Sequence, residues 1–134
     1  MTTAPRIHVS AAVITDAAGR VLVVRKHGTT VFMQPGGKPE PGESAADALA
    51  RELHEEIGLV VVAAELEPLG TFEADAANEP GHRVVAETFR VRAGVDAVSA
   101  RAEIAELRWI TPADVEGMQL APLSLDHLLA LAWD

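Results

Sequence analysis

The sequence predicts an α/β protein that folds as a single domain over residues 1–134. The length is sufficient for one hydrophobic core and too short for two ordinary domains joined by a linker. Several segments rich in Val and Ile alternate with turn-forming residues, which is typical of strands. One further segment combines helical spacing of its apolar residues with signals for both helix ends. Strands and helices are therefore both expected.

The first strands are expected to form a β-hairpin. Residues 6–14 and 21–25 are rich in Val and Ile and flank a turn segment that contains Asp16 and Gly19. The apolar run at residues 31–33 predicts a short strand. Three Pro and three Gly then occur within residues 34–42, and this composition predicts a rigid loop without a regular element.

A helix is predicted over residues 45–57. Ser44 and Asp47 have the spacing of an N-terminal capping motif, and Gly58 provides a typical end. The residues that form one apolar stripe at helical spacing are Ala46, Leu49, Ala50, Leu53 and Ile57.

The second half of the chain predicts more strands and two closing helices. Strands are expected over residues 59–64, 69–74, 83–92 and 103–110, with a polar loop at 75–82. Thr111 and the proline that follows it predict the start of a short helix. A last helix is expected over residues 124–133, with Leu125, Leu128, Leu129 and Ala132 on its buried face.

Composition excludes several classes of protein. The formal net charge of −9 argues against binding to extended nucleic acid or to an anionic membrane surface. The absence of cysteine excludes disulfides, thiolate metal sites and a cysteine nucleophile. No stretch approaches the roughly 20 apolar residues of a membrane span. The first residues lack the apolar core of a secretion signal, so we expect a cytoplasmic location.

The negative charge is concentrated between residues 37 and 59, where six acidic residues face only two basic ones. Such a run is ordinarily a solvated helix face. Here, however, Glu52, Glu55 and Glu56 lie at positions i, i+3 and i+4, so their carboxylates share one side of a single turn. Their mutual repulsion would be relieved by a cation, and carboxylate oxygens suit Mg²⁺ or Mn²⁺. The pattern predicts a metal site that binds phosphate.

The same residues resemble a known family motif. Gly37 is followed after five residues by Glu43, and after seven more by the segment Arg-Glu-Leu-His-Glu-Glu-Ile-Gly-Leu at residues 51–59. This arrangement resembles the Nudix box, Gly-x5-Glu-x7-Arg-Glu-U-x-Glu-Glu-x-Gly-U with U aliphatic, and matches every specified position. The resemblance implies an α/β/α sandwich around a central mixed β-sheet. It also implies metal-dependent hydrolysis of a diphosphate linkage in a nucleoside diphosphate derivative or nucleoside triphosphate.

The resemblance further implies roles for individual residues. Glu52, Glu55 and Glu56 would be metal ligands, together with the backbone carbonyl of Gly36. Arg51 and Glu43 would form an orienting pair that positions the helix and the loop. Glu56 could bind the metal or activate water. The general base could also come from outside the motif, and the candidates there are Glu103 and Glu106.

Substrate contacts are harder to predict. Strict alternation along residues 83–92 would place Glu87 among apolar neighbours, where an acid needs a partner. Arg25, at a strand end, could contact a phosphate or a ribose, and Phe32 could stack on a base. For each of these residues a purely structural role is also open. The expected partner is a small nucleoside diphosphate derivative, and family resemblance suggests a homodimer.

Two other functions remain open. A nucleotide-sensing module could keep this fold without turnover, although such a module could dispense with the intact carboxylates. An isomerase could use the same metal scaffold on an isoprenoid diphosphate. That chemistry would need a cysteine or an equivalent protonating residue, and the chain has no cysteine.

Overall fold

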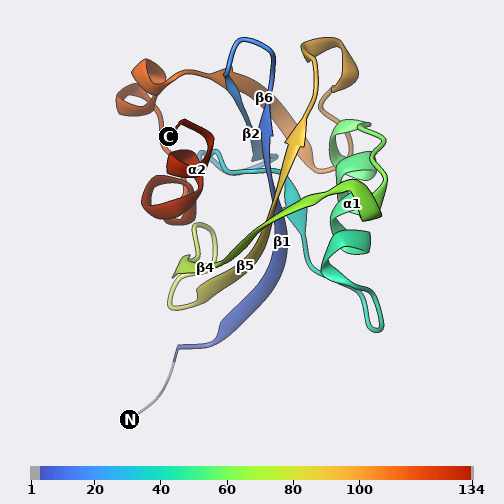
Figure 1. The fold of residues 1–134 in the computed structure, drawn as a ribbon. Helices are drawn as coiled ribbons and strands as arrows, with labels where there is room; N and C mark the ends of the chain where they lie inside the picture. Colours follow the sequence, from blue (N-terminus) through green and yellow to red (C-terminus); the bar gives the residue numbers. More distant parts are fainter. Residues whose placement is uncertain (1–3, 134) are drawn as a thin grey trace.

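The computed structural model describes residues 4–133 and shows an α/β fold built on one mixed β-sheet (Figure 1). The strand order is β4-β5-β1-β2-β6, with β3 paired to β1. Strands β1 and β5 are parallel, and the other pairs are antiparallel. The strands are β1 (Arg6–Thr15), β2 (Val21–Lys26), β3 (Gly36–Gly37), β4 (Glu67–Asp75), β5 (Arg83–Arg92) and β6 (Ile104–Ile110). The predicted α/β class and the mixed sheet are confirmed.

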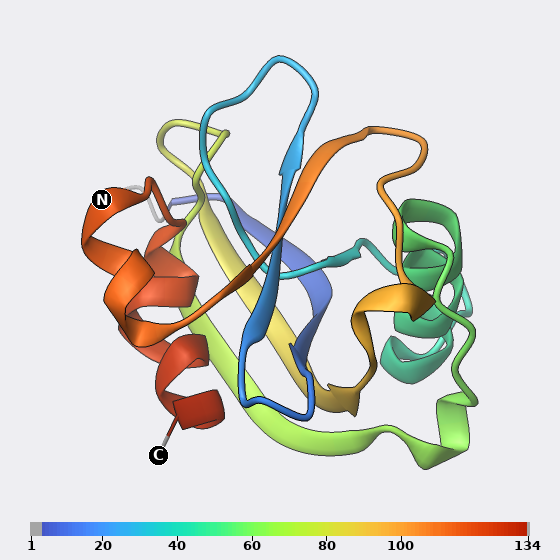
Figure 2. The same ribbon diagram turned by 90° about the horizontal axis from the view of Figure 1, so that it is seen from above.

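Helices cover both faces of the sheet. Helix α1 (Ala45–Ile57) lies on one face and the C-terminal helical segments, ending in α2 (Leu129–Trp133), lie on the other (Figure 2). Successive residues of β1 point to opposite faces. Ile14 therefore packs with Leu49 and Leu53 of α1, whereas Val13 packs with Leu128 near the C-terminus. The result is the three-layer sandwich expected from the sequence.

Helix α1 has the predicted boundaries. The Oγ atom of Ser44 accepts a hydrogen bond from the N–H of Asp47 at 3.1 Å. Gly58 ends the helix with φ of 69°, a left-handed conformation that favours glycine, and its N–H donates to the carbonyl of His54. Burial of Leu49, Leu53 and Ile57 fixes which side of α1 faces the sheet.

The prediction of a strand over residues 59–64 is wrong. This segment is irregular and leads into the 3-10 turn η1 (Ala63–Glu65). Leu59 is buried, but Val60 and Val62 are exposed. The segment pairs with no strand among residues 4–133. A run of β-branched residues forms a strand only where a neighbour can accept its backbone hydrogen bonds.

The prediction of a loop without regular structure at residues 34–42 is wrong at two residues. Gly36 and Gly37 form β3, which pairs with Ser10 and Ala11 of β1. Gly36 has φ of 154°, and a Cβ atom there would collide with the carbonyl oxygen of Ser10. Because glycine has no side chain, the loop can approach β1 closely enough to form a sheet bridge.

The C-terminal segment differs from a regular helix. The 3-10 turn η3 (Pro112–Gly117) follows a capping box formed by Thr111 and Asp114. Residues 124–128 form one π-helical turn, η4 (Ser124–Leu128), before α2 begins. Leu128 and Leu129 are buried as predicted, but Leu125 is exposed because the wider π turn changes the angular spacing of side chains. Among residues 4–133, no helix has the length and apolar character needed to cross a membrane.

Candidate metal centre and substrate pocket

Three carboxylates converge beside the sheet. Glu52 and Glu56 project from α1 at i and i+4, and Glu103 comes from the segment just before β6. One oxygen atom of each carboxylate lies within 4.8 Å of the others. Glu56 is buried, Glu52 is half-buried and Glu103 is exposed. We refer to Glu52, Glu56 and Glu103 as the carboxylate cluster.

Backbone hydrogen bonds bring Glu103 to the helix. The N–H groups of Ser99 and Arg101 donate to the carbonyls of Ile57 and Glu56, each at 2.9 Å. The carbonyl of Glu103 accepts from the N–H of His27, also at 2.9 Å. These contacts attach the segment to the end of α1 and to the end of β2. Because these contacts join segments that are distant in sequence, the motif alone does not show that Glu103 lies beside Glu52 and Glu56.

Glu56 lies in an environment that opposes its ionisation. Burial raises the pKa of Glu56 to about 8, and the nearby carboxylates of Glu52 and Glu103 add to the rise. The N–H of Gly36 donates to Oε1 of Glu56 at 3.1 Å and acts in the opposite direction. Burial also raises the pKa of Glu52. A cation at the cluster would favour the ionised forms.

Arg51 connects the helix to the preceding loop. Its guanidinium makes two hydrogen bonds to the carboxylate of Glu43, both at 2.9 Å, and one to Oε1 of Glu52 at 2.7 Å. The bonds from Arg51 lower the pKa of Glu43 to about 2. Gly37 also positions Glu52, because a Cβ atom at Gly37 would lie 2.5 Å from the Cδ atom of Glu52. Arg51 and Glu43 thus form the ion pair expected from the motif.

Glu55 lies apart from the other two motif glutamates. It is exposed, and its carboxylate is 3.7 Å from Nη1 of Arg51. The cluster that could hold a metal ion consists of Glu52, Glu56 and Glu103, and Glu55 is not part of it. Helical geometry explains the difference. Glu56, at i+4, projects close to the direction of Glu52, whereas Glu55, at i+3, is rotated to the opposite side of Glu52 and away from Glu56.

The carboxylate cluster fits a hard divalent cation. All three side chains offer oxygen ligands, the donor type that Mg²⁺ and Mn²⁺ prefer. Arg51 neutralises only part of this charge, through Glu52. Three carboxylates brought this close, one of them buried, are electrostatically unfavourable unless a cation or protons compensate them.

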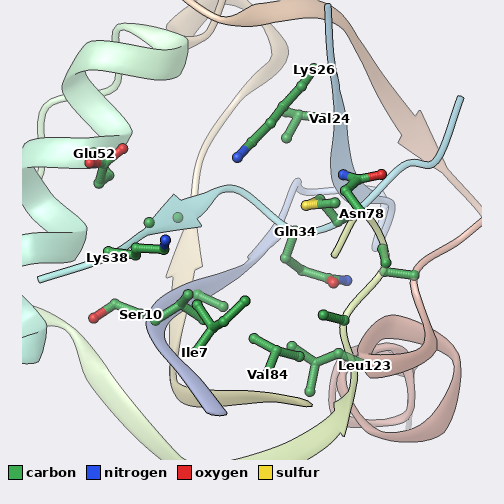
Figure 3. A pocket seen from close by; sticks show the side chains of 18 of the residues that line it. Ile7, Ser10, Val24, Lys26, Gln34, Lys38, Glu52, Asn78, Val84 and Leu123 are labelled. Carbon is green, nitrogen blue, oxygen red and sulfur yellow. The ribbon is translucent and has the colours of Figure 1, made fainter. Parts of the chain in front are cut away.

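A pocket of about 400 Å³ opens beside the cluster. One end is polar and includes the carboxylate cluster, Gly36 and Gly37. The other end lies between β1, β5 and the segment before η4. Its walls include the apolar side chains of Ile7, Val84 and Leu123 together with the amides of Gln34 and Asn78 (Figure 3). Val9, Met33 and Ser124 also line the pocket. We call these two parts the acidic end and the apolar end.

Two lysines face the pocket. Lys26 and Lys38 both line it, and their side chains extend toward its middle (Figure 3). The ion pairs found among residues 4–133 involve neither lysine. Their positive charges are therefore available to an anionic ligand close to the acidic end.

The structure places three predicted substrate contacts outside this pocket. Arg25 lies 3.4 Å from Glu106 and donates to the carbonyl of Thr29. Phe32 is buried in the core beneath the guanidinium of Arg108, which is 5.0 Å from the ring centroid. Glu87 is exposed rather than enclosed by apolar neighbours, so its carboxylate needs no protein partner. Sequence reasoning gave no signal for the pocket residues Gln34 and Ser124, whereas Asn78 lies in the polar loop predicted at residues 75–82.

The fold and the site define an α/β protein with a carboxylate centre suited to a divalent cation beside a pocket that is also lined by two lysines. The chain belongs to the NUDIX domain family, whose model matches residues 4–133. This result agrees with the motif at residues 37–59.

Individual relatives have different activities. An isopentenyl-diphosphate Delta-isomerase of Nocardia farcinica is 37% identical over 109 residues, which cover 75% of this chain and 61% of the relative. An 8-oxo-dGTP diphosphatase of Haemophilus influenzae is 39% identical over 71 residues, covering 50% of this chain and 52% of the relative. The E. coli ORF135 protein has a similar structure, with a TM-score of 0.71, 27% identity and coverage of 95% and 89%. The matches span between 52% and 65% of the curated relatives' length.

Proposed function

We propose that this protein is a Nudix hydrolase that cleaves a diphosphate linkage in a nucleoside diphosphate derivative or a nucleoside triphosphate, using Mg²⁺ or Mn²⁺. The observation that carries the proposal is the carboxylate cluster at the end of a pocket lined by two lysines without ion pairs. Membership of the family and similarity to an 8-oxo-dGTP diphosphatase support it.

Each residue of the acidic end would have a separate task. Glu52 and Glu56 would hold the ion from α1, with the carbonyl of Gly36 as a further ligand. A divalent ion held there would neutralise phosphate charge and lower the pKa of coordinated water. Glu103 is the exposed member of the cluster, so it is the best placed to accept the proton of the attacking water. Lys26 and Lys38 would bind phosphate oxygens of the substrate.

Arg51 would act as a positioning residue. Its bonds to Glu43 and Glu52 hold the loop and the helix in a fixed relation, so that Glu52 keeps its orientation. Glu55 would contribute through Arg51 and through the local negative charge. Fixed placement of charged groups accounts for most of the rate acceleration in phosphoryl chemistry.

The test is a hydrolysis assay over a panel of substrates with and without metal. The panel contains ADP-ribose, NADH, dinucleoside polyphosphates, and normal and oxidised nucleoside triphosphates. We expect release of phosphate, diphosphate or nucleoside monophosphate from at least one of them, only when Mg²⁺ or Mn²⁺ is present. If no member of the panel is cleaved at saturating metal, the proposal is contradicted.

Similarity to an isopentenyl-diphosphate Delta-isomerase makes isomerisation a second candidate. The pocket has an apolar end that could accept a hydrocarbon chain. The chain contains no cysteine, so a protonating residue would have to be of another type. Incubation with isopentenyl diphosphate distinguishes the two activities. Conversion to an allylic diphosphate without release of phosphate would favour isomerisation over hydrolysis.

Several expectations from the sequence belong to the same proposal. We infer a single functional domain over residues 1–134, a homodimer, a small-molecule nucleotide partner and a cytoplasmic location. The alternative function is sensing of a nucleotide without turnover. Nucleotide binding in a direct binding measurement, together with no hydrolysis in the assay above, would favour sensing over hydrolysis.

A further inference from the structure

The apolar end of the pocket contains a buried amide that has no partner for its nitrogen. Gln34 lines the pocket, and 93% of its surface is buried, since its relative exposure is 7%. Its Nε2 atom is the one buried side-chain nitrogen or oxygen of residues 4–133 without a hydrogen-bond partner. An unpaired buried donor is unfavourable, and native proteins seldom retain one without a reason.

The orientation of this amide is fixed from the other side. The hydroxyl of Ser124, which is completely buried, donates to Oε1 of Gln34. Ser124 begins the π-helical turn η4, so this bond joins the C-terminal layer to the loop before β3. Because the oxygen of the amide is engaged by Ser124, the NH₂ group is the end left for a ligand.

The neighbours of Gln34 suit a flat heterocycle. In Figure 3 its amide lies between Asn78 and the apolar side chains of Val84 and Leu123. Ile7 and Met33 extend the same apolar wall. At the acidic end, the carboxylate cluster and the two lysines would hold the phosphates, so a nucleotide would direct its base toward Gln34.

We propose that Gln34, positioned by Ser124, makes the protein prefer bases that present a carbonyl oxygen over bases that present an amino group at the same place. This inference rests on the proposed nucleotide function and names the class of base. A carbonyl oxygen accepts a hydrogen bond from Nε2 and supplies the missing partner. An exocyclic amine would place two donors against each other and leave both unpaired.

The experiment compares matched pairs that differ in this group, namely ITP with ATP and UTP with CTP. The quantity measured is the ratio of kcat/KM for the carbonyl member to that for the amino member, determined with Mg²⁺. Dissociation constants of the monophosphate pairs IMP with AMP and UMP with CMP, from titration calorimetry, give the same ratio without turnover. We expect the wild-type chain to favour the carbonyl member of at least one pair about tenfold.

Variants of Gln34 and Ser124 test the cause. Gln34→Met removes the donor at similar size, so the ratio should fall to about one. Gln34→Glu replaces the donor by an acceptor while Ser124 can still donate to the other oxygen, so the ratio should fall below one. Ser124→Ala frees the amide and should reduce the ratio without abolishing hydrolysis.

The matched control is Gln119→Glu. Gln119 is exposed and outside the lining of the pocket, and the change adds the same charge. It should leave the ratio unchanged. Because every ratio is taken within one variant, effects on metal affinity or folding cancel.

The outcomes separate this inference from the proposed function. Hydrolysis with ratios near one in both pairs, or with ratios that Gln34→Glu leaves unchanged, would overturn the inference and keep the hydrolase. If no hydrolysis is found but the chain prefers IMP or UMP and Gln34→Glu reverses this preference, the inference is supported and the proposed hydrolase function is contradicted. Absence of any preference in binding as well would overturn the inference.

Discussion

The two ends of the pocket differ in how the chain builds them. The acidic end takes two of its three carboxylates from one turn of α1, within a motif that is contiguous in sequence. The apolar end brings Ile7, Gln34, Val84 and Ser124 together from β1, the loop before β3, β5 and η4. Local sequence therefore supplies two of the three carboxylates of the acidic end, whereas the apolar end depends on long-range packing.

The largest effect is expected at Glu56. Glu56→Gln keeps the acceptor for the N–H of Gly36 but removes the buried carboxylate proposed to bind the metal. We expect kcat to fall by about a thousandfold, because a displaced metal ion withdraws several kcal/mol of transition-state stabilisation. Steady-state kinetics on the best substrate of the panel measures this effect.

Thermal unfolding provides the control for Glu56→Gln. The variant should be at least as stable as the wild type without metal, because it relieves repulsion in the cluster. A loss of less than about tenfold in kcat would show that other residues bind the metal and activate the water.

The second prediction concerns Glu103, the member of the carboxylate cluster that is distant in sequence from the other two. Glu103 lies outside the motif but joins the cluster through the backbone contacts of residues 99–103. Glu103→Gln should lower kcat about a hundredfold, as removal of a general base does. Glu106→Gln is the matched control, since Glu106 pairs with Arg25 and Arg108 instead. Equal effects of the two changes would remove Glu103 from the site.

The third prediction uses the raised pKa of Glu56. Without metal, the folded state retains a proton on Glu56 between pH 4.5 and about 8, while the unfolded state has released it. The associated stability is fully present below pH 4.5 and is lost as the pH rises through about 8. Because one pKa unit corresponds to about 1.4 kcal/mol, the rise from 4.5 to about 8 corresponds to a loss of up to about 5 kcal/mol in the free energy of unfolding. Urea unfolding at several pH values measures it.

Metal should reverse this dependence. Mg²⁺ at the cluster would favour its ionised form, so the stabilisation that Mg²⁺ provides should increase over the same pH range. Glu56→Gln should lack both the metal-free loss and the metal-dependent gain. A slope that is the same in wild type and Glu56→Gln would assign the pH dependence to another group.

The smallest effect is expected at Glu55. This carboxylate is exposed and lies 3.7 Å from Nη1 of Arg51, which places it at the edge of the acidic end. Glu55→Gln should lower kcat/KM by less than about fivefold, in the range of a surface ion pair. A loss as large as that of Glu56→Gln would return Glu55 to the set of metal ligands that the motif implies.

Sequence reasoning succeeded where the determinants are local. The boundaries of α1 followed from Ser44, the apolar stripe and Gly58, all within one segment. The strand over residues 83–92 was also predicted with its observed ends. The pair of Arg51 and Glu43 was available from the motif alone.

The failures have a common physical origin in contacts between distant segments. Residues 59–64 have strand propensity but no neighbouring strand, and Gly36 and Gly37 form one because β1 accepts them. Leu125 is exposed because residues 124–128 adopt a π turn, which no simple spacing rule predicts. The placement of Gln34 against Ser124 likewise depends on how the C-terminal layer packs on the sheet.

Binding of Mn²⁺, followed by electron paramagnetic resonance without substrate, tests the central claim most directly. The wild-type chain and a variant carrying both Glu52→Gln and Glu56→Gln are compared, with Glu73→Gln as a control because Glu73 pairs with surface arginines. We predict specific Mn²⁺ binding in the wild type and in Glu73→Gln, and its loss in the double variant. Unchanged binding in the double variant would contradict a metal centre at the carboxylate cluster.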